Sequence, residues 1–191
     1  MEVTGLYLIA CALLVAAGLA KAARPDDTAR ALAALVPERG MPLVRLRRAV
    51  RAGALAEAAL GLVALALPRP VTAALVAASY LCFAVVVLVA RRRGGPLATC
   101  GCFGRPDTPP TVVHVVLDVV LAVGAAVLAV AAPRQGTLVT SLAHQPWAGL
   151  PLVFVSAVGA WLTLLALSAL GELEGARRLL RPARYGAVAP P

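Results

Sequence analysis

Five long apolar runs dominate the chain. They cover residues 3–23, 49–67, 71–90, 111–132 and 149–171. Each holds about 20 residues, and at about 1.5 Å per residue this length matches the ~30 Å hydrocarbon core of a bilayer. Apolar and polar residues do not alternate with a period of two, so the runs predict helices and not the strands of a barrel. The pattern predicts an all-α integral membrane protein with about five membrane-spanning helices.

The composition supports a membrane protein and excludes an ordinary soluble domain. Hydrophobic residues make up 61% of the 191 positions and charged residues 14%, whereas soluble domains have roughly 45–50% apolar residues. The first run follows Met1 and Glu2 without a preceding basic segment, so we expect a retained helix and not a cleaved signal peptide. The lipid bilayer is therefore the first expected partner.

The net charge of +9 reads as a topology signal and not as a nucleic-acid surface. Of the 18 Lys and Arg residues, 16 lie in or beside the connection after the first run, after the third run or after the fifth run. The other side receives only Arg69 and Arg134. The positive-inside rule then predicts a multi-pass cell-membrane protein with its N-terminus outside and its C-terminus in the cytoplasm.

The runs and connections predict three regions. Residues 1–132 form a bundle of four helices. A linker and an additional spanning helix occupy residues 133–181, and residues 182–191 form a disordered tail. The first cytoplasmic connection, residues 24–48, is basic enough to predict a short amphipathic segment on anionic headgroups.

The stretch Cys100-Gly101-Cys102-Phe103-Gly104 carries the clearest chemical signal. Two thiols separated by one glycine can close into a small strained disulfide ring, and a strained disulfide is readily reduced. Nearby arginines and the start of the next helix favour the thiolate form. The alternative is a reduced pair in an ordinary turn, since stable disulfides are rare in the cytoplasm.

A metal site is a weaker alternative for the same cysteines. Thiolates bind zinc, copper or iron, and Cys100 and Cys102 with His114 supply three ligands. A closed site needs a fourth, such as Asp107 or a group from a second subunit. We therefore expect no metal and no cofactor, and the sequence leaves the oligomeric state open.

The order of these features resembles the MauE family of methylamine-utilisation membrane proteins, itself similar to the DoxX-like four-helix membrane proteins. The resemblance covers about residues 3–132. The matching features are a first helix ending in Lys21, a Pro-containing connection, Ala56-Glu57 in the second helix, arginines ending the third, the motif from Cys100 to Gly104, and a helix starting near His114 and Asp118. The arginine-rich segment 39–51 and the fifth helix depart from this pattern.

The resemblance implies a membrane thiol-disulfide oxidoreductase that supports maturation of an exported partner protein, as proposed for the methylamine dehydrogenase light chain. It implies an exported protein substrate and a thiol redox partner, without implying methylamine metabolism here. Two other classes remain open: a non-enzymatic membrane scaffold or chaperone, and a metal-binding membrane protein.

Glu57 is an ionisable residue inside the second run, where a charge costs at least a few kcal/mol and normally faces the bundle interior. Gly53, Glu57 and Gly61 are spaced at i, i+4 and i+8, which predicts a small-residue stripe where a neighbouring helix approaches closely. Two roles are open for Glu57: a structural ion pair with Lys21 or Arg51, or proton handling.

His114 and Asp118 are four residues apart and share one face of the fourth predicted helix. A carboxylate next to an imidazole orients it, and the imidazole can then take a proton from a cysteine. The candidates for catalysis are therefore Cys100, Cys102, His114, Asp118 and Glu57. The alternative for the helical pair is a polar helix start in which Asp118 bonds a neighbouring helix.

Cys11 and Cys82 lie deep in the first and third runs, at ~12 Å and ~16 Å from their outer ends. A buried pair at similar depth could relay electrons between the two faces of the membrane. The stronger interpretation is that each is a small buried hydrophobe.

Overall fold

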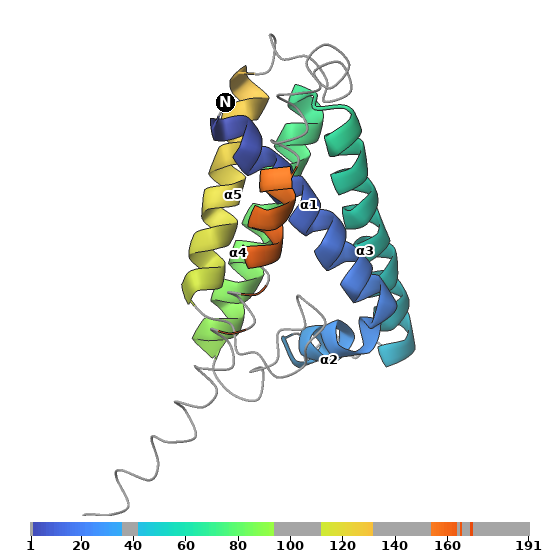
Figure 1. Ribbon diagram of the computed structural model, residues 1–191. Coiled ribbons are helices and arrows are strands. Elements are labelled where there is room, and N and C mark those ends of the chain that lie inside the picture. Colours follow the sequence, from blue (N-terminus) through green and yellow to red (C-terminus); the bar gives the residue numbers. More distant parts are fainter. Residues whose placement is uncertain are drawn as a thin grey trace, which may run out of the picture.

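The computed structural model describes residues 2–35, 42–93, 112–131 and 154–163, together with residues 165 and 169 (Figure 1). Over these residues the chain is helical and contains no strand. Four of the helices are long and apolar enough to cross a membrane: α1 (Glu2–Ala23), α3 (Leu43–Ala66), α4 (Pro70–Arg93) and α5 (Val112–Ala131). The predicted all-α membrane fold is confirmed.

The helix boundaries differ most at α3, which begins at Leu43 and not near residue 49. The extra turns contain Arg45, Arg47 and Arg48, and arginine is a good helix former although it is not apolar. Hydropathy detects only the apolar part of this helix, which begins near residue 49. The helix itself begins six residues earlier. The connection before it contains a separate helix, α2 (Pro25–Leu35), whose acidic residues Asp26 and Asp27 outnumber its one basic residue, Arg30. The predicted contact with anionic headgroups stays a prediction.

Helix α2 begins with residues suited to a helix start. Pro25 fills the first position, where a missing N–H costs nothing, and Asp26 and Asp27 follow in the first turn, where negative charge is favourable. An ion pair of 3.1 Å between Asp26 Oδ1 and Arg47 Nε joins α2 to α3. Helix α2 therefore lies across the end of the bundle where α1 ends and α3 begins (Figure 1).

Helix α1 crosses the bundle diagonally and contacts both α3 and α5 (Figure 1). It packs along α3, and α4 packs along α5. Near the start of α1, the side chain of Leu6 lies against Gly124 of α5. Near its end, Gly18 lies against the backbone of α3. The end of α1 is thereby held next to the middle of α3.

The close contact between α1 and α3 depends on small residues. A Cβ atom on Gly18 would lie 2.6 Å from the Ala54 carbonyl oxygen and 2.8 Å from the Ala58 nitrogen. One on Gly61 would lie 2.9 Å from the Cys11 carbonyl oxygen. Close helix contact through glycine and alanine is typical of membrane proteins.

The predicted small-residue stripe is right at Gly61 and wrong at Gly53. A Cβ on Gly53 would meet nothing within 4 Å, and Gly53 is exposed. The buried stripe of α3 instead runs through Ala54, Ala58 and Gly61. The prediction looked for glycine alone, whereas in α3 the alanines Ala54 and Ala58 also allow the neighbouring helix to approach closely.

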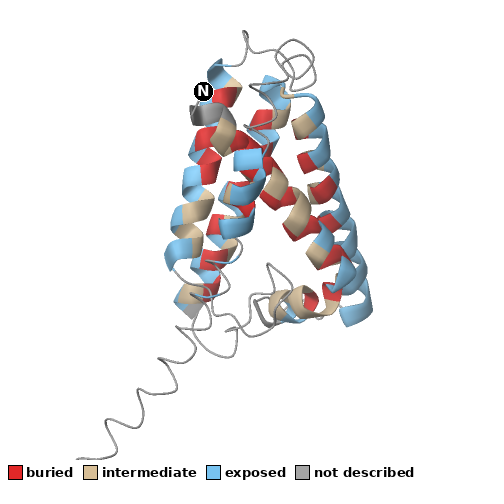
Figure 2. Ribbon diagram, viewed as in Figure 1, coloured by how far each residue is buried: buried red, intermediate tan, exposed pale blue. Residues whose placement is uncertain are grey.

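Apolar side chains cover the outside of the helices as well as the core. The largest fully buried side chains are those of Tyr7, Cys11, Leu14, Val76 and Leu121. Figure 2 shows the buried positions on the inward sides of the helices and exposed positions around them. Exposed large apolar residues occur on all four long helices, among them Leu19, Leu62, Leu81 and Val123. Such a surface is stable in contact with lipid and not with water.

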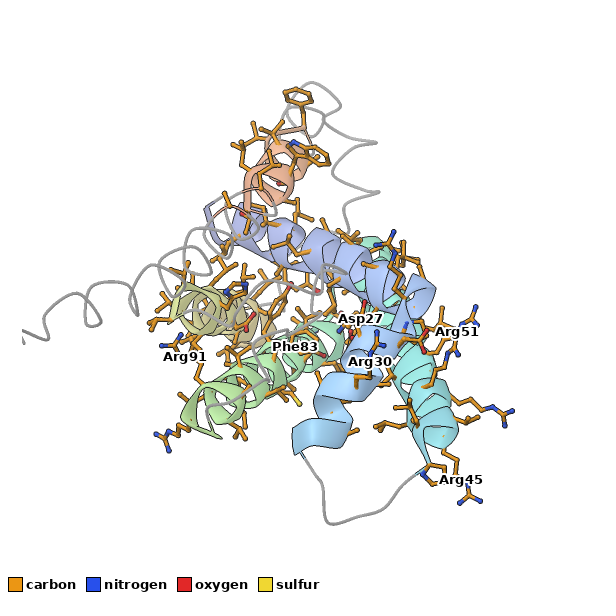
Figure 3. All side chains as sticks on the ribbon, turned by 90° about the horizontal axis from the view of Figure 1, so that it is seen from below. Asp27, Arg30, Arg45, Arg51, Phe83 and Arg91 are labelled. Atoms are coloured by element: carbon orange, nitrogen blue, oxygen red, sulfur yellow. The ribbon has the colours of Figure 1, made fainter. Side chains whose placement is uncertain are left out.

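One end of the bundle is basic. The start of α3 carries four exposed arginines, which are Arg45, Arg47, Arg48 and Arg51. In Figure 3, which views this end from below, Arg45 and Arg51 point away from the bundle. Helix α4 ends at this same end with Arg91 and Arg92, and α5 begins there (Figure 1). The residues that flank the cysteine motif on both sides therefore lie at the basic end.

The predicted additional spanning helix is described only in part. A helical segment at residues 154–163 is apolar but shorter than a membrane span. Its Gly159 lies against Ile9 of α1, and its Ala160 is buried in the core. The rest of the predicted 149–171 helix and the predicted tail at 182–191 lie outside the described residues.

Candidate functional site

A buried ion pair connects α1 to α3 at the basic end of the bundle. Lys21, in the last turn of α1, is only 8% exposed and forms a salt bridge with Glu57 of α3 through Nζ and Oε2. Gly18, one turn earlier on α1, permits the close helix contact that brings the two side chains together. A paired lysine avoids the large cost of an isolated charge in an apolar interior.

Helix α4 places one aromatic ring against this ion pair and a second ring behind the first. Lys21 Nζ lies 4.5 Å from the centroid of the Phe83 ring, which is a cation–π contact. The rings of Phe83 and Tyr80 meet edge to face, with centroids 5.9 Å apart. The Tyr80 hydroxyl donates a hydrogen bond of 2.6 Å to the Ala10 carbonyl of α1. Lys21 is therefore held by an anion on one side and an aromatic face on the other.

A cavity of about 40 Å³ lies beside Lys21. Its polar lining residues are Lys21, Tyr80, His114 and Asp118, and the others are apolar side chains of α1, α4 and α5. Its volume exceeds the roughly 10–15 Å³ that one water molecule requires. The cavity is thus large enough for water and has polar groups that can hold it.

Four spanning helices supply one polar cluster, which we define as Lys21, Glu57, Tyr80, His114 and Asp118. It contains one cation, two carboxyl groups, one imidazole and one phenol, arranged around the Phe83 ring and the cavity. Carboxyl and imidazole groups next to water can take up and release protons. The cluster is therefore suited to proton handling.

The structure brings together three of the five predicted site residues. His114 and Asp118 line the same cavity, as their spacing predicts. Glu57 does not line it, but forms a salt bridge with Lys21, which does. Of the two predicted ion-pair partners for Glu57, Lys21 is the one observed, while Arg51 is exposed. Cys100 and Cys102 lie outside the described residues, as does Asp107.

Cys11 and Cys82 do not form a buried pair. Both are free, and Cys11 is fully buried whereas Cys82 is exposed on the outer side of α4. The packing interpretation holds for Cys11 and is wrong for Cys82, and the electron relay has no support because the two residues differ in burial. Within the ranges that the structure describes, no group of three or more His, Cys, Asp or Glu residues could hold a metal ion.

Sequence reasoning named Lys21 only as a possible partner and missed Tyr80 and Phe83 as site residues. A lysine at the end of an apolar run was a usable signal, since such a residue must find a partner or water. Tyr80 and Phe83 are three apart and so share a helix face. Aromatic residues inside an apolar run nevertheless give no indication that a cation lies nearby.

The fold and the site define a multi-pass helical membrane protein with a buried polar cluster at the basic end of a four-helix bundle. The family model for methylamine utilisation protein MauE matches residues 2–131. This match covers more than half of the chain and includes all four spanning helices, so the chain belongs to the MauE family. Comparisons with curated proteins and with solved structures gave no match.

Proposed function

We propose that this MauE-family protein exchanges thiols and disulfides with a partner through Cys100 and Cys102, and that it supports the maturation of an exported protein. The observation that carries the proposal is the position of His114 and Asp118. Both line one cavity near the start of α5, the helix that follows the cysteine motif in the chain. Thiol–disulfide exchange requires a thiolate, and a proton acceptor on the helix that follows the motif can help to form one.

The exchange has two steps in the direction that oxidises the protein. The thiolate of one cysteine attacks a disulfide of the partner, forms a mixed disulfide and releases one partner thiolate. The thiolate of the second cysteine then attacks the first cysteine's sulfur, which closes the Cys100–Cys102 disulfide and releases the second partner thiolate. Two electrons pass to the partner, and the two protons leave the cysteines. In our proposal His114 accepts a proton and Asp118 orients its ring. The reverse direction uses the same bonds.

The proposed orientation places the N-terminus outside and the cysteine motif in the cytoplasm. It is supported by the exposed arginines of α3 and by Arg91 and Arg92 of α4, which share the end of the bundle where the motif's flanking helices end and begin. An impermeant maleimide should label Cys100 and Cys102 only after intact cells are permeabilised. Labelling of these cysteines in intact cells would contradict the proposed orientation and place the motif outside.

Differential alkylation of membranes equilibrated in graded redox buffers tests the exchange. We expect Cys100 and Cys102 to change together from free thiols to a disulfide as the buffer becomes more oxidising. Cys100→Ser and Cys102→Ser should each abolish the transition, whereas Cys82→Ser, at an exposed cysteine outside the site, should leave it unchanged. If Cys100 and Cys102 stay reduced in every buffer, the thiol–disulfide proposal is refuted. The alternative of a non-enzymatic membrane scaffold would then stand.

A further inference from the structure

The polar cluster has one permanent cation and two carboxyl groups, together with the imidazole of His114. Lys21 supplies one positive charge, while Glu57 and Asp118 supply two carboxyl groups. Inside a membrane-spanning bundle an unbalanced charge costs at least a few kcal/mol. While His114 is neutral, Lys21 can balance only one carboxylate. The cluster is then electrically neutral when the other carboxyl group carries a proton.

The position of Lys21 gives it access to both carboxyl groups. Its ammonium pairs with Glu57, and the Lys21 residue also lines the cavity that Asp118 lines from α5. A lysine side chain has a flexible four-carbon stem and a compact charge with three donors, so its ammonium can change partner without movement of the backbone. The Phe83 ring lies against the ammonium and offers it a favourable surface during such a change.

We propose that Glu57 and Asp118 share Lys21 and one exchangeable proton, and so form a proton-transfer site inside the membrane. In the first state Asp118 is a neutral acid and Lys21 pairs with ionised Glu57, which is the pair that the structure shows. In the second state Glu57 is the neutral acid and Lys21 pairs with ionised Asp118. The proton leaves an Asp118 oxygen and passes through water in the cavity to Lys21, whose ammonium gives one of its own protons to a Glu57 oxygen. Both states have zero net charge.

Each helix packed around the site contributes to this balance. Helix α1 provides Lys21, α3 provides Glu57, and α5 provides Asp118 with His114 one turn before it. On α4 the Tyr80 hydroxyl is engaged with the Ala10 carbonyl.

Arg91 of α4 follows the cavity residue Val87 by one turn and lies toward the basic end. His114 lies between this end and Asp118 in the sequence of α5, and so it is placed to deliver protons to Asp118 or to receive them. The inference rests on the proposed function only for the source of these protons, which would be the thiols of Cys100 and Cys102.

Infrared spectroscopy of the full-length protein in lipid bilayers at neutral pH tests the shared proton. A protonated carboxylic acid has its own carbonyl stretching band, and exposed carboxylates, which are ionised, do not contribute to it. We expect the wild type to show a band of one carboxylic acid that shifts in heavy water, because the cavity admits water. Asp118→Asn should remove this band. Asp26→Asn, at a partly exposed carboxylate that pairs with Arg47, should leave it unchanged.

Glu57→Gln is the decisive variant, because it does not alter Asp118 directly. If the two carboxyl groups share Lys21, the lysine freed from Glu57 pairs with Asp118, which becomes ionised, and the band disappears. If Asp118 is neutral for reasons unrelated to Lys21, the band keeps its full area in Glu57→Gln. That result, or a wild type without any band, would overturn the proposal.

A second variant keeps the test valid if Glu57→Gln fails to fold. Removing the cation in Lys21→Met should leave both carboxyl groups neutral and double the area of the band, while an unchanged area contradicts the shared lysine. The same spectra of a Cys100→Ser, Cys102→Ser protein separate this site from the thiol chemistry. An unchanged band in this variant, together with a wild-type protein that never forms the Cys100–Cys102 disulfide, would refute the proposed function and preserve the proton site.

Discussion

Replacing Gly18 with alanine tests whether the α1–α3 contact holds the polar cluster together. The new Cβ would lie 2.6 Å from the Ala54 carbonyl oxygen and 2.8 Å from the Ala58 nitrogen, whereas ordinary contact begins at 3.4 Å. Both atoms belong to the backbone of α3, so no side chain can rotate away. The helices must separate by several tenths of an ångström, and this separation falls one turn from Lys21.

Overpacking of this kind typically costs about 1–3 kcal/mol. We therefore expect Gly18→Ala to lower the free energy of unfolding by about that amount. Gly53→Ala is the matched control, because a Cβ at this exposed position of α3 meets nothing within 4 Å. Alanine is a better helix former than glycine by about 0.5–1 kcal/mol, so the control should be neutral or slightly stabilising.

Cys11 provides a built-in reporter for this experiment. It is fully buried, and its carbonyl oxygen lies at the same α1–α3 interface, close to Gly61. In a protein with Cys82, Cys100 and Cys102 changed to serine, the rate at which Cys11 reacts with a thiol reagent during thermal unfolding reports the opening of the interface. Equal unfolding midpoints for Gly18→Ala and Gly53→Ala would refute the close-contact argument.

Three further changes test contacts of α4 and α5. Tyr80→Phe removes the hydrogen bond to the Ala10 carbonyl and should cost about 0.6–1.5 kcal/mol of unfolding free energy, and a stabilised variant would contradict the bond. A double-mutant cycle of Phe83→Leu and Lys21→Met, measured by the same unfolding assay, should give a coupling of about 0.5–2 kcal/mol, and zero coupling would exclude the cation–π contact. Gly124→Ala should cost less than Gly18→Ala, because its Cβ meets the flexible side chain of Leu6, and an equal or larger loss would show that this side chain cannot move.

Hydropathy was sufficient to predict the four spanning helices, because the bilayer sets both their length and their composition. It was insufficient for the start of α3, where arginines extend the helix past the apolar span. The inward direction of Glu57 was predictable from the cost of a buried charge. The choice of Lys21 over Arg51 was not, since it depends on the diagonal course of α1 and the close contact at Gly18.

The remaining differences come from side-chain direction around a helix. A run that is apolar on every face has no clear periodicity, so the sequence does not show that Gly53 and Cys82 face outward. For the same reason it does not show that Tyr80 and Phe83 face Lys21. These directions are set by contacts between helices that are distant in sequence.

The most direct test of the account is the oxidation of the purified, full-length protein in lipid bilayers by a small disulfide such as oxidised glutathione. Mass spectrometry of the peptide that contains Cys100 and Cys102 measures the product. We predict that this peptide loses two hydrogen atoms, as closure of an internal disulfide requires, and that the loss is reversed by reduced glutathione and proceeds more slowly in Asp118→Asn. Cysteines that only accumulate glutathione adducts, without closing a disulfide, would contradict the proposed dithiol.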